Sequence, residues 1–395
     1  MKKFAQTSVI AGLLALSAQA YADDEYQQFL QEQNKGFQEE QEAFAQYKAD
    51  VTKEYDDYVA EQERLFKEYT GQIEAKWGAK NVVTSTTKQY VSYDANYSSR
   101  SSVDFENGTA KVEVLVTEEE AKNPKVVEQK LKERVAQLAV AKGGTDPLEK
   151  KNAIPPEKKP ILSAQLATKD GQPVTEKNAQ RYAEQAVQPA QITRQTVNSQ
   201  DGVKRVAVGV QVSLVSNHIK LRATEFRDNL KKDSDRFGID IALALAITHT
   251  ESSFNPKAKS SVAYGLMQLV PKSGARDAYL YVYKKDQMVT GDYLFVPNNN
   301  IELGTALLSK LMKVDFRGVE DMNSRLYCAI SAYNTGPGNV ARAFTGKYNV
   351  KNALPQINAM TSDQVLEHLK QNLPYEETRT YVAKVSDRMS QWAKQ

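Results

Sequence analysis

Cysteine is almost absent from this sequence: Cys328 is the only one among 395 residues. An internal disulfide is therefore excluded, and the domains must be stabilised by hydrophobic cores, which a chain of this length can bury. Because Cys328 lies in the apolar segment 326–330, we expect a packed core thiol and not a reactive one. Histidine is also scarce, with three residues, and no group of His, Cys and acidic residues has metal-ligand spacing. We therefore expect neither a metal nor a cofactor.

Long apolar runs are missing too. The run at residues 9–16 follows Lys2 and Lys3 and is too short to span a bilayer. Two overlapping small-x-small sites then occupy residues 18–22, an arrangement typical of a secretory signal peptide. We expect residues 1–22 to be removed and the protein to be exported to the periplasm without a transmembrane segment. Because no cysteine lies near the cleavage site, a lipoprotein anchor is not expected.

A large net charge is also lacking. The 52 basic residues nearly balance the 49 acidic ones, so the strongly basic composition typical of nucleic-acid-binding proteins is absent, and nucleic acid is not expected as a partner. The balance is uneven along the chain, because residues 23–79 contain 15 acidic and 6 basic residues and leave the remainder basic. A basic remainder suits an anionic polymer.

Residues 23–79 contain no proline, and large apolar residues recur there every seven positions. This period predicts one long acidic amphipathic helix, which either forms a coiled coil or packs along the protein's own body. Its negative charge argues against a helix that lies on a membrane surface. Self-association and binding to an envelope protein both remain open for this segment. The heptad positions are Leu30, Phe37, Phe44, Val51, Tyr58 and Leu65.

Residues 80–218 have the composition of a small α+β domain. Asn107-Gly108 between alternating runs predicts a β-hairpin. Within the second run, apolar residues alternate with mostly polar ones over 110–116, which predicts a strand that faces a core on one side only. Residues 206–214 alternate as well, and we expect this strand to join the hairpin in one sheet.

The other segments of the chain are predicted to be helical or irregular. An apolar face and a proline in the first turn predict a helix over 124–141. The proline-rich stretch 143–160 is interpreted as a loop or linker. Residues 219–395 are predicted to be helical with short loops, and Asn300 is expected to cap a core helix at 301–308.

A strongly apolar helix is predicted from Ile239. Asp240 can cap it, and residues 241–247 are apolar on every side, as in a helix buried in a domain core. Glu251 follows one turn later, before the turn residues 252–256 that end the helix. A carboxyl group placed there is poorly solvated, so its pKa should be raised, which favours a general acid near neutral pH. This stretch alone leaves a solvated surface charge as the alternative.

Four motifs occur in order in this region. They are Glu-Ser-Ser-Phe-Asn-Pro at 251–256, Gly-Leu-Met-Gln at 265–268, Ala-Tyr-Asn-Thr-Gly at 332–336 and Glu-Thr-Arg-Thr-Tyr-Val at 377–382. As an ordered set they are far more specific than any one alone. Together they resemble the lytic transglycosylases with a lysozyme-like fold.

This resemblance implies the fold class and the domain organisation. Residues 80–218 resemble the accessory domain that precedes the catalytic domain in the membrane-bound C type of these enzymes. The expected architecture is mainly α with an α+β accessory domain at 80–218, a lysozyme-like helical catalytic domain at 219–395, and a long N-terminal helix at 23–79. Members of the C type are tethered to the outer membrane by lipid. In this chain, attachment to the outer membrane or cell wall would need the N-terminal helix or a partner protein.

In the family resembled here, one Glu serves as acid and then as base. The resemblance assigns this role to Glu251, which would protonate the leaving sugar's oxygen and then take a proton from the C6 hydroxyl of N-acetylmuramic acid. No second acid occurs at a comparable motif position, unlike the paired carboxylates of ordinary glycosidases. His249 is expected to be structural. Tyr381 is expected to approach Glu251, and the substrate-binding residues implied are Ser260, Met267, Gln268, Tyr333, Asn334 and Tyr381.

The predicted function is that of an exported peptidoglycan lytic transglycosylase, a carbon-oxygen lyase acting in cell-wall turnover or remodelling. It would cleave the β-1,4 bond between N-acetylmuramic acid and N-acetylglucosamine and leave 1,6-anhydromuramic acid ends. Two alternatives stay open. One is a non-catalytic protein that binds peptidoglycan as a scaffold, and the other is a hydrolytic muramidase that uses water in place of the C6 hydroxyl.

Overall fold

The computed structural model describes residues 46, 52–53, 55–151 and 159–394. The chain divides into two compact units, residues 1–60 and 61–395. All described residues of the first unit are helical. The predicted signal peptide and the heptad positions before Tyr58 lie outside the described residues. Within the described ranges, no helix combines the length and the apolar character needed to cross a membrane.

The second unit contains an antiparallel sheet with strand order β1-β2-β3-β5-β4. The Asn107-Gly108 turn joins β2 to β3, and Asp104 accepts hydrogen bonds from two backbone amides of this turn. Strand β5 pairs with β3 along its length, which confirms the predicted single sheet. The strands are β1 (Gln89–Tyr93), β2 (Ser99–Asp104), β3 (Thr109–Thr117), β4 (Thr193–Asn198) and β5 (Lys204–Ser213).

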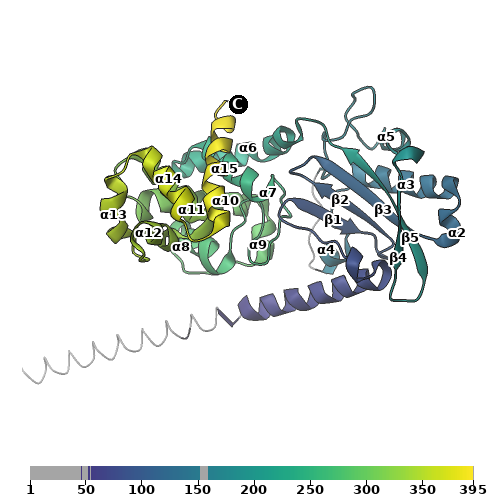
Figure 1. Cartoon of the computed structure of the whole chain (residues 1–395), viewed down its shortest axis with the longest axis horizontal. Coiled ribbons are helices and arrows are strands. Elements are labelled where there is room, and N and C mark those ends of the chain that lie inside the picture. Colours follow the sequence, from purple (N-terminus) through teal and green to yellow (C-terminus); the bar gives the residue numbers. More distant parts are fainter. Residues whose placement is uncertain (1–45, 47–51, 54, 152–158, 395) are drawn as a thin grey trace, which may run out of the picture. The chain divides into compact units, whose positions relative to one another are not determined.

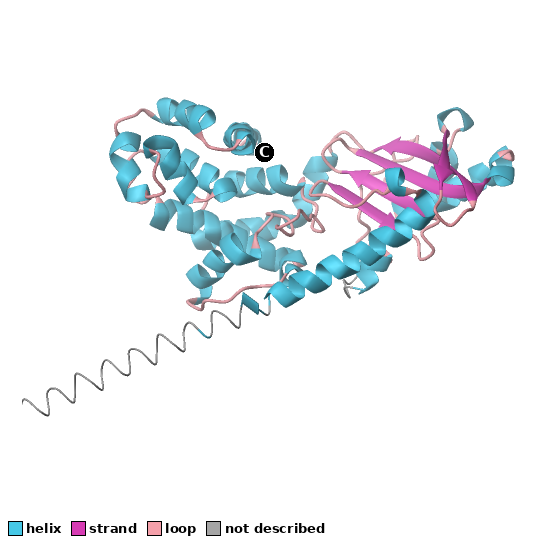
Figure 2. Cartoon of the chain, turned by 60° about the horizontal axis from the view of Figure 1, so that its bottom comes forward, coloured by secondary structure: helices cyan, strands magenta, loops and turns pink. Residues whose placement is uncertain are grey.

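Helices cover both faces of this sheet (Figure 2). One face shares an apolar core with α3 (Pro124–Ala139) and α5 (Ala179–Ala186). The other face shares a second core with the helical residues 61–77, through Trp77 and Leu115. The prediction that the 110–116 strand faces a core on one side only is therefore wrong. Leu115, on the other side of the strand, packs in a core with a helix that lies earlier in the chain.

A short helix, α4 (Pro147–Lys151), lies within the stretch predicted as a loop or linker. Pro147 occupies its first turn, and the Asp146 carboxylate accepts hydrogen bonds from the backbone amides of Leu148 and Glu149. A side-chain cap therefore stabilises this helix. The loop prediction is wrong for these residues, and 152–158 lie outside the described residues.

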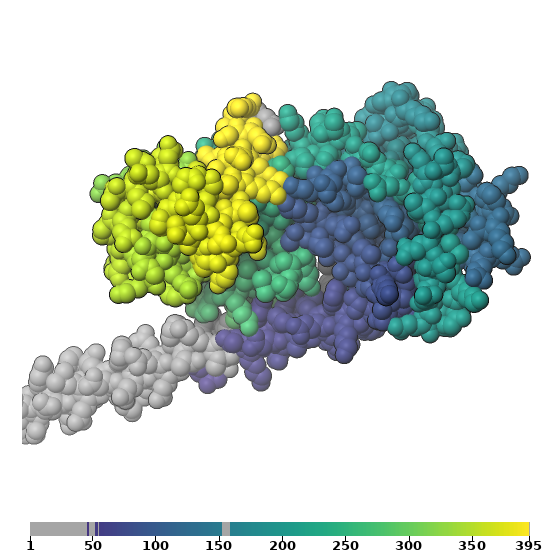
Figure 3. All heavy atoms as spheres, viewed as in Figure 1, coloured from purple at the N-terminus to yellow at the C-terminus, as the bar shows by residue number. Residues whose placement is uncertain are grey.

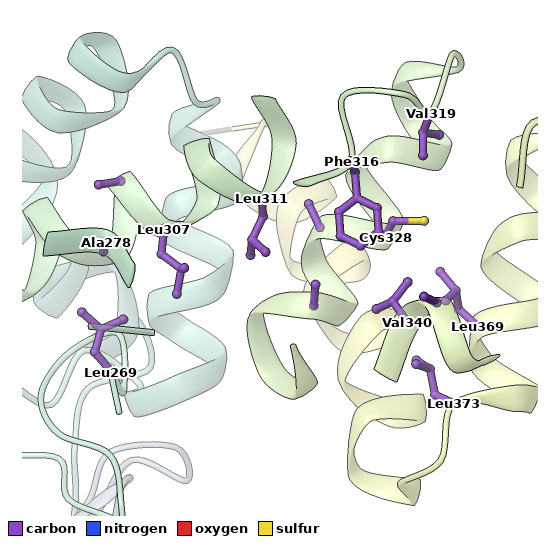
Figure 4. Close-up of a cluster of buried hydrophobic side chains, with 14 of the residues drawn as sticks. Leu269, Ala278, Leu307, Leu311, Phe316, Val319, Cys328, Val340, Leu369 and Leu373 are labelled. Atoms are coloured by element: carbon purple, nitrogen blue, oxygen red, sulfur yellow. The ribbon is translucent and has the colours of Figure 1, made fainter. Parts of the chain in front are cut away.

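The rest of the second unit is helical, which confirms the mainly α class with an α+β region. Cys328 is fully buried beside Phe316 in the core of this region (Figure 4), and burial raises the pKa of its thiol to about 12. The thiol is a core residue, as predicted. The main helices are α6 (His218–Phe237), α7 (Ile241–Ser252), α8 (Arg276–Tyr283), α9 (Gly291–Phe295), α10 (Pro297–Lys310), α11 (Met322–Thr335), α12 (Pro337–Thr345), α13 (Val350–Asn358), α14 (Ser362–Asn372) and α15 (Glu376–Trp392).

Candidate active site

Helix α7 carries Glu251 near its end and packs against α6 and α15 (Figure 1). Its start is fixed by Asp240, whose carboxylate accepts a 2.8 Å hydrogen bond from the backbone of the first turn. Residues 242–247 are all buried, because the helix has no polar face and must bury every side. Ser253 and Phe254 then adopt left-handed conformations, with φ of 51° and 59°. The helix therefore ends directly after the acidic residue, as predicted.

Two tyrosines flank the Glu251 carboxyl group. Tyr381 on α15 donates a 2.6 Å hydrogen bond to Glu251 Oε1. Tyr333 on α11 is near enough that, besides burial, the charge of Glu251 raises the pKa of its phenol. Burial raises the pKa of Glu251 itself to about 7, and the hydrogen bond from Tyr381 opposes this shift. The carboxyl group therefore has a pKa suited to giving and taking a proton near neutral pH.

Two charged residues act on Glu251 without touching it. Glu377, exposed on the first turn of α15, raises the pKa of Glu251, and Lys88 lowers it. Lys88 directly precedes β1 and so comes from the α+β region. Sequence reasoning missed it, because a lone lysine in a polar stretch carries no local sign that it lies near a distant carboxyl group.

Asn300 holds the loop that contains the Gly-Leu-Met-Gln motif. Its side chain accepts a 2.7 Å hydrogen bond from Met267 N and donates to the carbonyl oxygens of Tyr264 and Leu294 at 2.8 and 2.9 Å. Asn300 lies inside α10 and is fully buried, so the prediction that it caps a helix is wrong. Gly265 has a φ of 78°, and a Cβ there would collide with the Asn300 amide. The motif glycine is thus required by this contact.

Met267 has a buried side chain that cannot reach a bound substrate. It is fully inaccessible and lies in the core shared with α7. It also fills the space beside Gly304 of α10, where a Cβ would collide with its side chain. Its carbonyl oxygen instead accepts a 2.8 Å hydrogen bond from Tyr333 Oη. The expected side-chain contact with substrate is therefore replaced by a positioning contact with a tyrosine.

A groove runs beside Tyr333. Gln268 lines it, and its amide nitrogen donates to the carbonyl oxygens of Ala258 and Gly265. Asn334 also lines it, and its side-chain oxygen accepts a 2.6 Å hydrogen bond from Thr378 Oγ1. Both amides are thus fixed by protein contacts. The groove is lined by residues that include Gln268, Ser273, Leu307, Tyr333, Asn334 and Gly336.

Two other predicted residues have structural contacts. The Ser260 hydroxyl accepts hydrogen bonds from the backbone amides of Val262 and Ala263 at 3.3 and 2.9 Å, which stabilises its own turn. The ring of His249 stacks on Phe254 with centroids 5.8 Å apart, and burial lowers its pKa to about 3. The imidazole is therefore neutral and packed, as predicted. Within the described ranges, no group of three or more His, Cys, Asp or Glu residues could hold a metal ion.

Comparison with known proteins places both regions in described families. Residues 228–355 match the family described as Transglycosylase SLT domain. Residues 37–225 match the family described as Membrane-bound lytic murein transglycosylase C, N-terminal domain.

Full-length relatives match both regions at once. The membrane-bound lytic murein transglycosylase C of Sodalis glossinidius is 34% identical over 325 residues, which cover 82% of this chain and 87% of the relative. The protein of the same name from Yersinia pestis is 34% identical over 326 residues with the same coverage. Among solved structures, the 70 kDa soluble lytic transglycosylase of Escherichia coli is 27% identical over 43% of this chain and 24% of that chain, with a TM-score of 0.33.

Proposed function

Because the chain belongs to the membrane-bound lytic murein transglycosylase C family, we propose that it cleaves the β-1,4 bond between N-acetylmuramic acid and N-acetylglucosamine in peptidoglycan and leaves 1,6-anhydromuramic acid ends. The main support for this proposal is the environment of the Glu251 carboxyl group. Its carboxyl group accepts a hydrogen bond from Tyr381, and burial raises its pKa to about 7. Such a group can be an acid in one step and a base in the next.

The first step is protonation of the leaving sugar. Tyr381 occupies Glu251 Oε1, which leaves Oε2 to carry the proton toward the glycosidic oxygen. As that oxygen takes the proton, its bond to C1 of the muramic acid breaks and positive charge develops at C1. The Glu251 carboxylate that results stabilises this charge, and Tyr381 stabilises the carboxylate through its phenolic hydrogen.

The second step closes the ring within the same sugar. The Glu251 carboxylate removes the proton of the C6 hydroxyl, and O6 bonds to C1. The carboxyl group is thereby restored, and no water is consumed. A single acidic residue is sufficient for both steps. Glu377, the neighbouring carboxylate that acts on Glu251, is solvent-exposed and takes no part in either one.

The remaining predicted residues bind or position. Gln268, Tyr333 and Asn334 line the groove and contact the glycan, with Ser260 on the turn that precedes the Gly-Leu-Met-Gln loop. Met267 acts through its carbonyl oxygen, which fixes Tyr333. Rigid amides and hydroxyls of this kind are the groups that sugar hydroxyls and acetamides need.

The test is digestion of purified sacculi, with the products identified by mass spectrometry. The intact protein should release anhydro ends, and Glu251→Gln should lower the rate by about 100- to 10,000-fold, the contribution of a general acid-base group. Reducing ends instead of anhydro ends would assign the protein as a hydrolytic muramidase. Binding without cleavage by the unmodified protein would assign it as a scaffold.

The protein is proposed to be exported and to act in the periplasm, at the outer membrane or the cell wall. Residues 23–60 are proposed to reach a second copy or an envelope protein. The helical residues 61–77 contribute to the sheet's own core, so the test should remove 23–60 only. Light scattering gives the number of copies per particle with and without these residues. A fall in that number on deletion supports self-association, whereas an unchanged number leaves the envelope protein as the partner.

A further inference from the structure

The β2–β3 hairpin of the α+β region reaches the end of the helix that carries Glu251. Its residues Phe105 and Glu106 directly follow β2 and contact side chains of α6 and α15. Figure 3 shows the resulting contact from outside, where the blue α+β region touches the yellow C-terminal helix. The hairpin therefore connects two regions that are distant in the sequence.

Glu106 is the centre of a charged cluster. Its Oε2 accepts hydrogen bonds from Lys88, at 2.9 Å, and from the Ser253 hydroxyl. Its Oε1 accepts one from Arg388 at 2.5 Å, and Lys384 lies 3.6 Å away. Burial opposes ionisation, but these hydrogen bonds and positive charges outweigh it and hold the pKa of Glu106 well below its usual range. Glu106 is therefore a fixed negative charge at neutral pH.

The hairpin also binds two arginines that donate hydrogen bonds to backbone carbonyl oxygens at the end of α7. Arg388 donates a 2.9 Å hydrogen bond to His249 O, and Arg222 donates to Ser253 O and Phe254 O at 3.2 and 2.6 Å. The last carbonyl groups of a helix lack partners within the helix and carry partial negative charge. Arg388 is paired with Glu106, while the Arg222 guanidinium stacks 3.5 Å over the ring of Phe105.

A further contact lies just beyond the helix. Asn255 donates a 3.3 Å hydrogen bond to Thr87 O, and Thr87 precedes Lys88, whose charge lowers the pKa of Glu251. Ser253 and Asn255 of the Glu-Ser-Ser-Phe-Asn-Pro motif thus both bind the α+β region. Neither contact is explained by the proton transfers of the proposed reaction.

We infer that the β2–β3 hairpin is a positioning element of the active site, in which Glu106, acting through Ser253 and Arg388, fixes the last turn of α7 and so the place of the Glu251 carboxyl group. The inference rests on the proposed transglycosylase activity. It gives the α+β region a task in catalysis that involves no contact with substrate. A displacement of about 1 Å in a catalytic group can cost about 100-fold in rate, so loss of this support should be visible in kcat.

The test compares two carboxylates of the α+β region. Glu106→Gln keeps the shape of the side chain and removes its charge. Glu113→Gln is the matched control, because Glu113 is also paired with two cations, Arg100 and Lys111, at 2.5 and 2.7 Å, and these lie within the sheet. Steady-state release of anhydro ends from soluble glycan strands gives kcat and KM, and thermal melting gives the folded fraction.

We expect Glu106→Gln to lower kcat by about 10- to 100-fold with KM changed less than about twofold. Per folded molecule, Glu113→Gln should keep the kcat of the unmodified protein. An unchanged kcat in Glu106→Gln overturns the inference, and so does an equal loss in both variants. If Glu106→Gln does not fold, Ser253→Ala removes the same link, and an unchanged kcat there has the same meaning.

A pH profile separates positioning from general support of the fold. The charged and titratable groups that act on Glu251 are Tyr381 and Glu377 from α15, Tyr333 from α11, and Lys88, which precedes β1 and binds Glu106 of the hairpin. Lys88→Met should move the alkaline limb of kcat/KM to higher pH, because the positive charge that favours ionised Glu251 is lost. An unmoved limb would overturn this part of the inference. If the unmodified protein releases no anhydro ends, the proposed function itself fails, which is a different result.

Discussion

Two carboxyl groups are bound near the end of α7, one from each region of the second unit. Glu251 belongs to the helical region and has a tyrosine as its hydrogen-bonded partner. Glu106 belongs to the α+β region and is bound by Lys88, Arg388 and a serine hydroxyl. Burial opposes ionisation of both, yet the pKa of Glu251 is raised to about 7 and that of Glu106 is held well below its usual range.

The difference teaches that burial alone does not decide the charge of these groups. Cations within hydrogen-bonding distance outweigh desolvation at Glu106, whereas a single neutral phenol does not at Glu251. The α+β region therefore holds Glu106 as a permanent charge, and the helical region holds Glu251, whose proton can move. Substitution of either carboxyl group, or of a residue that acts on Glu251, tests this difference.

The largest effect is expected on stability, in Glu251→Gln. A carboxyl group whose pKa is higher in the folded than in the unfolded protein costs stability as the pH rises through that interval, here from about 4.5 to about 7. The variant should therefore be more stable than the unmodified protein at pH 8, by up to about 3 kcal/mol, and equally stable near pH 4. Urea unfolding at the two pH values measures this, and an equal difference at both would contradict it.

The matching variant in the α+β region, Glu106→Gln, should change the free energy of unfolding in the opposite direction. A carboxyl group with a lowered pKa stabilises the folded protein above its unfolded pKa, and this contribution is lost as the pH falls through the folded value. The variant should thus be less stable at neutral pH, with a difference that shrinks in acid. A difference that grows as the pH falls would show that Glu106 is not held by its cations.

A smaller effect is expected from Tyr381→Phe, which makes the surroundings of Glu251 more apolar. Without the phenolic hydrogen bond, the pKa of Glu251 rises further and its carboxylate loses a stabilising donor. We expect kcat to fall about tenfold and the alkaline limb of kcat/KM to move to higher pH. Tyr333→Phe is the control, because its hydroxyl donates to Met267 O and not to Glu251. A limb that moves equally in both variants would show that Tyr381 has no special part.

The smallest effect is expected from Glu377→Gln. Its negative charge raises the pKa of Glu251 from an exposed position, where solvent screens it. Removal should move the alkaline limb slightly to lower pH, opposite to Tyr381→Phe, and leave kcat within about twofold. Raising the salt concentration should reduce the shift. A large loss of kcat would instead give Glu377 a direct role as a second acid.

The sequence alone was sufficient to predict the elements and residues that depend on their near neighbours in the chain. The capped apolar helix, the hairpin turn and the buried Cys328 each depend on neighbours within a few positions. The approach of Tyr381 to Glu251 is not local, and it came from the resemblance of ordered motifs. Both kinds of prediction are matched by the structure.

The missed features depend on long-range contacts. Glu106 binds Ser253 and Arg388 across 147 and 282 positions, so neither partner can be read from the hairpin itself. Strand β4 is almost wholly exposed and lacks the alternation that marks a half-buried strand. Similarly, the second covered face of the sheet results from Trp77 and its helix, which local alternation in β3 does not reveal.

The contact between Met267 and Gly304 makes these two positions one steric unit. Since the space over the glycine is taken by the thioether, adding even a methyl group to α10 at this point would push the motif loop, and Tyr333 with it, out of register. Gly304→Ala alone should therefore be harmful, and adding Met267→Ala should relieve the clash only in part, because the Cβ of residue 267 would still lie 2.9 Å from the new methyl group. The glycine in α10 and the methionine of the motif loop therefore limit each other's size.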